Sequence, residues 1–128
     1  MRILLDTHIL LWALGDRSRL GDAILSAIES EENDVLFSAA SIWEIAIKAS
    51  RGKADFGVSP TDIADAALGA GFTELPIRSR AACRVADLPL LHRDPFDRIL
   101  IAQALEEPAV LYTADAQLTA YSELVKRV

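Results

Sequence analysis

The sequence predicts an α/β fold built on a short, mainly parallel sheet, and two observations carry that prediction. Short apolar runs alternate along the chain with segments whose apolar residues recur at helical spacing, which is the order of elements that builds parallel sheets. The runs lack polar alternation, as is typical of strands covered by helices on both faces. A length of 128 residues suits one core, so we expect residues 1–128 to form a single domain.

The first part of the chain contains two predicted strands and three predicted helices. Residues 2–5 form an apolar run that reads as a buried strand, and helical spacing then continues to Leu14. Between residues 20 and 32 the apolar residues fall on one face of a helix. Residues 35–37 are a second short strand, and residues 39–50 are a strongly patterned helix.

The second part has shorter elements separated by glycine, proline and polar turn residues. The predicted elements are, in order, a loop at 52–60, a helix at 61–68 capped by Ser59 or Thr61, a weak strand at 72–77 interrupted by Pro76, a helix at 79–86, a loop at 87–92, a helix at 96–105, a strand at 109–112, a short helix at 116–121 and an edge strand within 123–128.

The charge balance narrows the functional classes. Thirteen basic and 19 acidic residues give a net charge of −6, which argues against a protein that holds nucleic acid by a basic surface alone. An enzyme whose acidic pocket is neutralised by a divalent metal remains compatible with this charge.

The N-terminus and the single cysteine bear on location. Arg2 followed by apolar residues is reminiscent of a secretory signal, but Asp6 and His8 interrupt the stretch, and residues 9–14 are too short to span a bilayer. Cys83 permits no internal disulfide, and its apolar neighbours suggest a buried thiol. We expect a cytoplasmic protein without a membrane segment.

Two aspartates follow predicted strands at the same edge of the sheet. Asp6 comes directly after the first strand, and Asp115 comes shortly after the strand at 109–112. Ligands of open α/β sheets bind at the carboxyl ends of the strands. Each aspartate could instead cap the helix that follows it, but convergence at one edge favours a site.

Glu44 lies inside a helix among apolar residues, where an unpaired carboxylate is costly. Lys48 is four residues later, the favoured order for a helical ion pair. Ser41, Glu44 and Lys48 share one helix face, and from the spacing alone this face is either the solvent side or the side of a pocket.

The segment HRDPFDRILIAQAL places Asp94 and Asp97 around a helix start. Pro95 suits the first helical position, which makes Asp94 the N-cap and Asp97 the third residue of the helix. Capping explains Asp94 better than Asp97. Because Asp97 shares a helix face with Ile101, a buried Ile101 would direct Asp97 to the sheet edge, and we favour Asp97 as the metal ligand.

Carboxylates from separate segments suit hard cations such as Mg²⁺ or Mn²⁺. The chain has only two histidines, His8 and His92, which argues against zinc, and no serine or cysteine nucleophile with a partner base is evident. The chemistry that follows is attack of a metal-activated water on a phosphate.

Four blocks, in this order and spacing, resemble the PIN-domain nucleases, and most closely the VapC-type toxins of toxin–antitoxin pairs. The blocks are LLDTHILLWAL, SAASIWEIAIKASRGK, HRDPFDRILIAQA and YTAD, and the resemblance extends from residue 1 to about residue 121. It implies a three-layer α/β/α sandwich and divalent-metal-dependent endonucleolytic cleavage of RNA. It also implies a small VapB-like antitoxin that covers the active site, and homodimers are common in the family.

The resemblance also assigns residues. The family's acidic metal-binding positions match Asp6, Glu44, Asp97 and Asp115, and an acid that shapes the helix start matches Asp94. Polar positions around the pocket match Thr7, Ser38, Ser41, Lys48, Arg98 and Thr113. After Asp115 the chain departs from the family pattern, which leaves open whether Asp115 or Asp94 completes the metal site.

Other interpretations remain open at this stage. A PIN fold that no longer cuts would be an RNA-binding or protein-interaction module, and a metal-dependent phosphohydrolase of small molecules would lack a glycine-rich phosphate loop here. Trp12 and Trp43 are expected to be core or dimer anchors, with stacking on RNA bases as the alternative. His8 is expected either to touch substrate or to pack, and His92 to be a loop residue. Arginines between residues 78 and 98 either line a solvated face or follow an RNA backbone.

Overall fold

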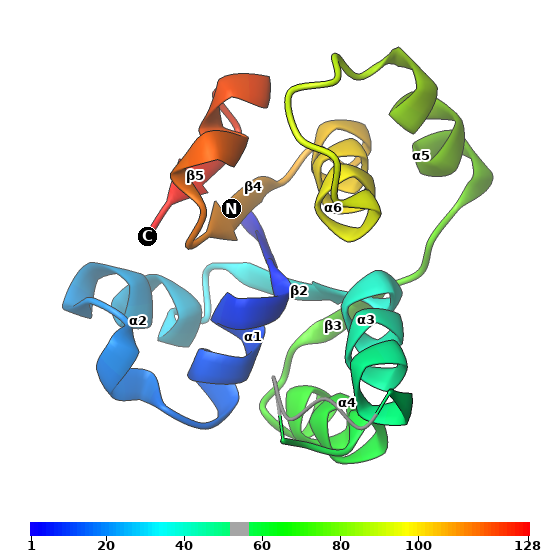
Figure 1. The fold of residues 1–128 in the computed structure, drawn as a ribbon. Helices are drawn as coiled ribbons and strands as arrows, with labels where there is room; N and C mark the ends of the chain where they lie inside the picture. Colours follow the sequence, from blue (N-terminus) through cyan, green and yellow to red (C-terminus); the bar gives the residue numbers. More distant parts are fainter. Residues whose placement is uncertain (52–56) are drawn as a thin grey trace.

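The computed structural model describes residues 1–51 and 57–128 and contains a five-stranded, wholly parallel sheet with the order β3-β2-β1-β4-β5 (Figure 1). The strands are β1 (Arg2–Leu5), β2 (Asp34–Ser38), β3 (Thr73–Leu75), β4 (Val110–Thr113) and β5 (Val125–Arg127). The α-helices are α1 (Thr7–Leu14), α2 (Asp22–Glu29), α3 (Ala39–Ser50), α4 (Pro60–Gly69), α5 (Ser79–Arg84) and α6 (Pro95–Glu106). Three 3₁₀ turns complete the described chain: η1 (Arg17–Arg19), η2 (Val85–Asp87) and η3 (Ala116–Tyr121).

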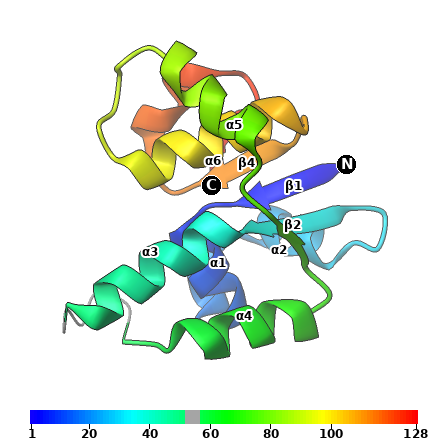
Figure 2. The same cartoon turned by 90° about the vertical axis from the view of Figure 1, so that its right-hand side faces the viewer.

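Helices cover both faces of the sheet, which confirms the predicted three-layer α/β/α architecture. Figure 2 shows α5 and α6 on one side of the strands and α1, α2 and α4 on the other. The three inner strands, β1, β2 and β4, are largely apolar because they are buried between these two layers, whereas the edge strands β3 and β5 are mostly exposed. Among the described residues, no helix is long and apolar enough to cross a membrane.

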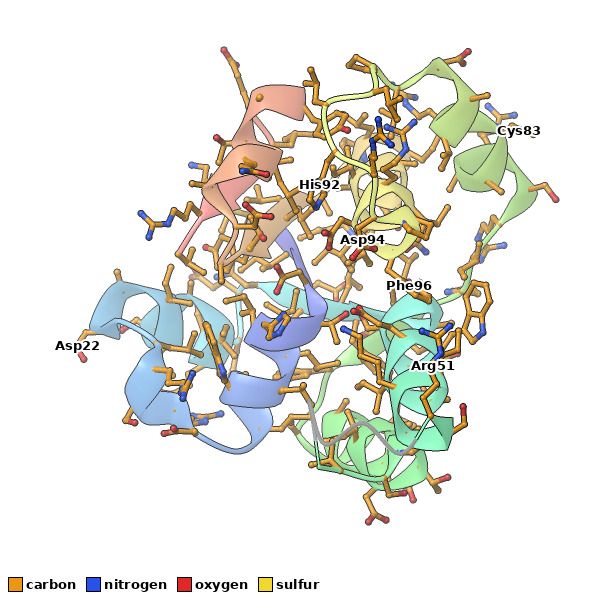
Figure 3. The ribbon with its side chains drawn as sticks, viewed as in Figure 1. Asp22, Arg51, Cys83, His92, Asp94 and Phe96 are labelled. Atoms are coloured by element: carbon orange, nitrogen blue, oxygen red, sulfur yellow. The ribbon has the colours of Figure 1, made fainter. Side chains whose placement is uncertain are left out.

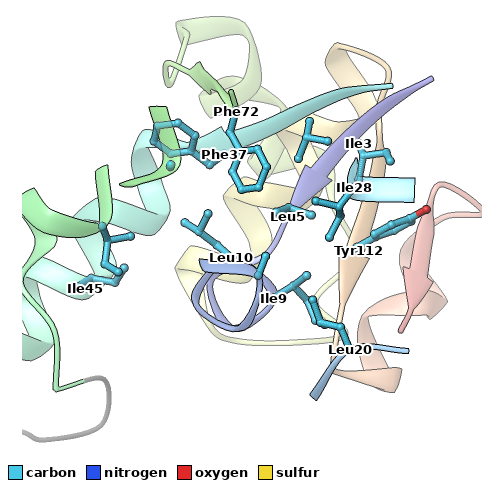
Figure 4. Close-up of a cluster of buried hydrophobic side chains, with 14 residues drawn as sticks. Ile3, Leu5, Ile9, Leu10, Leu20, Ile28, Phe37, Ile45, Phe72 and Tyr112 are labelled. Atoms are coloured by element: carbon cyan, nitrogen blue, oxygen red, sulfur yellow. The ribbon is translucent and has the colours of Figure 1, made fainter. Parts of the chain in front are cut away.

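Successive strand residues face opposite layers and therefore enter two separate apolar cores. Ile3 and Leu5 of β1 belong to the core on the side of α1, α2 and α4 (Figure 4), whereas Leu4 belongs to the core beneath α6. All three side chains are fully buried. The two cores fix the register of β1 because a slip of one residue would exchange their contents.

The strand order creates the place where a ligand site is expected. β1 is flanked by β2 on one side and β4 on the other, so the sheet grows in both directions from β1. At such a switch point the loops after the two neighbouring strands diverge and leave a crevice at their carboxyl ends. Asp6 and Asp115 follow the two strands concerned, β1 and β4.

The predicted helix at 20–32 is wrong in its extent, because α2 begins at Asp22 and ends at Glu29. Gly21 is the N-cap in an extended conformation, which leaves Leu20 outside the helix but buried. At the other end, Asn33 Nδ2 donates to the Ala27 carbonyl at 2.9 Å. The Asn33 side chain thus donates to a carbonyl of the last helical turn, in place of the backbone N–H that a longer helix would supply.

The prediction of a buried Cys83 is also wrong, because its thiol is exposed on the outer side of α5 (Figure 3). Arg84 at the end of α5 pairs with Glu106 of α6, and Ala81 is the buried residue of α5. Two residues further along a helix the side chain points about 200° away, so the apolar neighbours of Cys83 in sequence are not its neighbours in space.

The remaining boundaries agree with the prediction to within a few residues. The helix predicted at 79–86 divides into α5 and η2, the weak strand at 72–77 is the short edge strand β3, and the predicted C-terminal edge strand is β5. The predicted loop at 52–60 lies partly outside the described residues, and α4 begins within it at Pro60 with Ser59 as N-cap.

Candidate active site

A cleft of about 480 Å³ opens at the carboxyl edge of β1 and β4. Five acidic side chains line it: Asp6, Glu44, Asp94, Asp97 and Asp115. They come from the starts of α1, α6 and η3 and from the middle of α3. The fold thus brings together in one cleft all the acids that the sequence singled out.

Asp6 is held by both of its oxygens. Its Oδ1 accepts from the Ile9 N–H at 2.9 Å, which caps α1, and its Oδ2 accepts from Thr113 Oγ1 at 2.5 Å. The Thr113 hydroxyl oxygen in turn accepts from the Asp115 N–H at 3.0 Å. One hydroxyl therefore connects the ends of β1 and β4. Burial raises the pKa of Asp6, although the bond from Thr113 opposes the shift.

Glu44 is buried on the cleft side of α3, which resolves the two interpretations of its helix face in favour of the pocket. It is only 5% exposed. Thr7 Oγ1 donates to its Oε1 at 2.7 Å and also lies 3.0 Å from Ser41 Oγ, and Lys48 Nζ donates to its Oε2 at 2.9 Å. A buried carboxylate needs such partners to remain ionised.

Asp94 and Asp97 occupy the positions at the helix start that the sequence predicts. Asp94 Oδ1 accepts from the N–H groups of Phe96 and Asp97, so Asp94 is the N-cap of α6. Asp97 lies one turn in, and Ile101 on the same face is fully buried, as expected. Burial, reinforced by the nearby charge of Asp94, raises the pKa of Asp97 to about 6.

His92 was predicted to be only a loop residue, yet it lies against two of the acids. Its Nε2 is 2.9 Å from Asp97 Oδ2 and 3.7 Å from Asp115 Oδ2. Figure 3 shows His92 and Asp94 on the loop that leads into α6, between that helix and the C-terminal segment. The five-residue offset between His92 and Asp97 crosses a loop and Pro95, so no helical or strand period could have revealed this contact.

Some predicted pocket residues lie beside the cleft rather than lining it: Ser38, Ser41 and Thr113 are buried, and Arg98 is half-buried. Ser38 caps α3 and donates to Gln103 Oε1 at 2.6 Å. Arg98 donates to the carbonyl groups of Pro89 and Val85, at 2.9 and 3.1 Å, and so holds the loop before α6. Ser41 and Thr7 share a hydrogen bond between their hydroxyl groups, and Thr113 donates one to Asp6.

Cationic and aromatic side chains complete the cleft wall. Lys48 lies in the lining, as predicted, together with His8 and Trp12. Arg127 on the edge strand β5 also lines the cleft, which no pattern in the sequence indicated. The pairing of Thr113 with Arg127 in the parallel register of β4 and β5 puts this cation next to the acids.

The donor set fits a hard divalent cation. Carboxylate oxygens are the ligands that Mg²⁺ and Mn²⁺ prefer. The raised pKa values of Asp6 and Asp97 are the electrostatic cost of burying carboxyl groups in one cleft, and a bound cation would offset that cost.

The fold and the cleft define a class of protein, the three-layer α/β/α domains that carry a cluster of carboxylates at the switch point of a parallel sheet. Within that class the chain belongs to the PIN domain family, whose sequence pattern matches residues 3–124. This match confirms the family that the four sequence blocks indicated.

Solved structures with the same fold support this placement. VapBC2 from Rickettsia felis, bound to a DNA fragment from its promoter, aligns with a TM-score of 0.71 and 18% identity over 99% of this chain and 98% of that chain. VapBC-1 from nontypeable Haemophilus influenzae aligns with a TM-score of 0.66 and 16% identity over 100% and 97%. DNA-bound VapBC from Salmonella typhimurium aligns with a TM-score of 0.62 and 14% identity over 100% and 97%. No curated protein matches the sequence significantly.

Proposed function

We propose that this protein is a divalent-metal-dependent endoribonuclease and acts in the cytoplasm as the toxin of a VapBC-type toxin–antitoxin pair. The observation that carries the proposal is the cleft itself, in which carboxylates from three helix starts and one helix interior face the same space. Membership of the PIN domain family and the similarity to toxin–antitoxin complexes support it.

Asp6, Glu44, Asp97 and Asp115 are the residues that would hold Mg²⁺ or Mn²⁺, with Asp94 as an additional charge at the helix start. A bound divalent cation lowers the pKa of water and stabilises charge on the leaving oxygen of a phosphodiester. Thr7 keeps Glu44 oriented. Lys48 offsets the repulsion among the acids.

The nuclease activity is tested with purified protein and a mixture of RNA substrates. Cleavage should require Mg²⁺ or Mn²⁺, stop with a chelator, and be lost in Asp6→Asn, whose amide oxygen can still cap α1. Asp65→Asn removes the same charge from the exposed face of α4 and should cut as the wild type does. Unchanged cleavage by Asp6→Asn would remove Asp6 from the site, and cleavage that persists in chelator would exclude a metal mechanism.

The toxin role requires a partner. Expression of this chain alone should arrest growth, and co-expression of a small VapB-like protein encoded beside it should restore growth and co-purify with it. Growth that continues while the purified protein cuts RNA would separate the nuclease from the toxin role.

The homodimer is proposed on an apolar groove of about 310 Å³ between α3, α5 and α6. Trp43 at its rim is 58% exposed and meets the ring of Phe96 edge-on at 5.2 Å. Contiguous apolar surface on a small protein marks a contact site. Because Trp43 is largely exposed, the prediction that it anchors the core is wrong. The groove is lined by Trp43, Ile77, Ala82, Val85, Pro95, Phe96 and Ile99.

Light scattering tests the dimer. Trp43→Ser should convert a dimer to a monomer, whereas Leu68→Ser, which changes a similarly exposed apolar residue on α4, should leave the mass unchanged. A wild-type mass equal to that of one chain at concentrations used for cleavage would contradict the dimer.

A further inference from the structure

His92 Nε2 and one oxygen each of Asp97 and Asp115 lie within 4.8 Å of one another, close enough for the three to hold a cation together. Both aspartates line the cleft, whereas His92 is absent from the lining that the described residues form. Its Nε2 is at hydrogen-bonding distance from Asp97 Oδ2, 2.9 Å, and at 3.7 Å from Asp115 Oδ2. The imidazole therefore lies against carboxylates from two different elements, α6 and the start of η3.

The backbone of His92 is fixed by a second group of contacts. Its N–H donates to the Tyr121 hydroxyl at 2.8 Å, and Arg98 Nη1 donates to the same hydroxyl at 3.1 Å. Arg98 also donates through Nη2 to the Val85 carbonyl at 3.1 Å. Tyr121 closes η3, the turn that Asp115 begins, so one polar frame joins the loop of His92 to the element that presents Asp115.

A carboxylate that binds a cation through one oxygen can rotate unless its other oxygen is held. Residues behind a metal ligand supply this restraint, and their loss typically lowers metal affinity about 10–100-fold. Asp6 and Glu44 have such partners in Thr113 and Thr7. For Asp97, His92 is the side chain in the corresponding position.

We propose that His92 is a positioning residue: its Nε2–H holds Asp97 Oδ2, so that Asp97 Oδ1 faces a divalent cation in the cleft beside Asp115. This inference rests on the proposed function, because it requires that Asp97 and Asp115 bind a cation. It assigns His92 no contact with the metal or the substrate.

The test is Mn²⁺ binding to the full chain without RNA, measured by electron paramagnetic resonance of the free ion. His92→Ala should bind about 10–100-fold more weakly than the wild type. His92→Gln, whose side-chain amide can donate to Asp97 in place of Nε2–H, should recover most of the loss. Leu91→Ala alters an exposed neighbour on the same loop and should bind as the wild type does.

Each outcome has a separate meaning. Unchanged Mn²⁺ affinity in His92→Ala, or equal losses in the Ala and Gln variants, overturns the positioning role while leaving the nuclease proposal intact. A large ¹⁴N coupling of a directly bonded imidazole to bound Mn²⁺ that disappears in His92→Gln also overturns it, because His92 would then be a ligand. A wild-type protein that binds no Mn²⁺ overturns the metal mechanism and this inference together. If His92→Ala does not fold, His92→Phe, which keeps the ring volume without a donor, replaces it in the same comparison.

Discussion

Replacing Asp97 with asparagine should stabilise the metal-free protein, although the carboxylate is expected to bind the metal. Asp97 has a pKa of about 6 in the folded protein against a reference value of 3.8, with burial as the main cause and Asp94 as the second. The folded state holds this proton more tightly than the unfolded state does. Stability due to this group therefore falls as the pH rises from about 4 to about 6, and the full penalty is present above about pH 6.

The magnitude follows from the shift. Two pKa units correspond to about 3 kcal/mol, and because the side chain is 24% exposed, solvent screening reduces our expectation to about 1.5 kcal/mol. For a chain of this length that is an increase of about 5 °C in Tm. At about pH 4.5 the gain should shrink to about a third, because folded wild-type Asp97 is then protonated.

Scanning calorimetry in the presence of a chelator measures this directly. Asp97→Asn should melt above the wild type at about pH 7.5, and added Mn²⁺ should raise the wild-type midpoint more than that of the variant. Asp65→Asn removes the same charge from an exposed position and should change neither. A variant that melts below the wild type at about pH 7.5, or whose gain is the same at about pH 4.5, refutes the electrostatic reasoning.

Three further substitutions should change stability, Mn²⁺ binding or RNA binding in ways that can be measured separately. Lys48→Gln leaves buried Glu44 without its 2.9 Å ion pair, so the free energy of unfolding should fall by about 1–3 kcal/mol. Mn²⁺ binding, measured by titration, should become tighter, and weaker binding would contradict the idea that Lys48 offsets repulsion among the acids. Arg127→Gln removes a cation of the cleft wall, so RNA should bind more weakly to the Ca²⁺-loaded protein, which is not expected to cut. The slope of the logarithm of the binding constant against the logarithm of the salt concentration should decrease by about one phosphate contact. An unchanged slope would mean that Arg127 does not contact the RNA backbone. Arg98→Lys loses the guanidinium that donates to the carbonyl groups of the loop before α6, so urea denaturation should show a free energy of unfolding lower by about 2 kcal/mol. A loss of cleavage at unchanged stability would instead indicate a direct role of Arg98 in the site.

Local sequence rules predicted those parts of the site that depend on one element. The Asp94-Pro95 start of α6 and the inward direction of Asp97 follow from capping and from a single helical turn, and the structure has both. The alternation of elements likewise predicted the class of fold, because a buried parallel sheet leaves a direct mark on strand composition.

No comparable pattern in the sequence indicated the contacts between elements. His92 reaches Asp97 across a loop, and Arg127 reaches the cleft through the pairing of β5 with β4. Glu44 remained undecided because its helix spacing is the same whether its face meets water or a cleft. Cys83 was mispredicted because α5 buries only one side, and the neighbours of a residue in sequence do not show which side that is.

The acids of the cleft differ in what else depends on them. Asp6, Asp94 and Asp115 each start a helix or turn with a side-chain oxygen, so replacing any of them should lower stability whether or not the protein binds a cation. Glu44 lies in the middle of α3 and caps no helix. Its buried carboxylate needs the Thr7 hydroxyl and the Lys48 ammonium group as hydrogen-bond donors. Without a cation to bind, an apolar residue would serve the helix better at that position. We therefore expect Glu44 to be the first of these acids that related sequences replace once they no longer bind a cation.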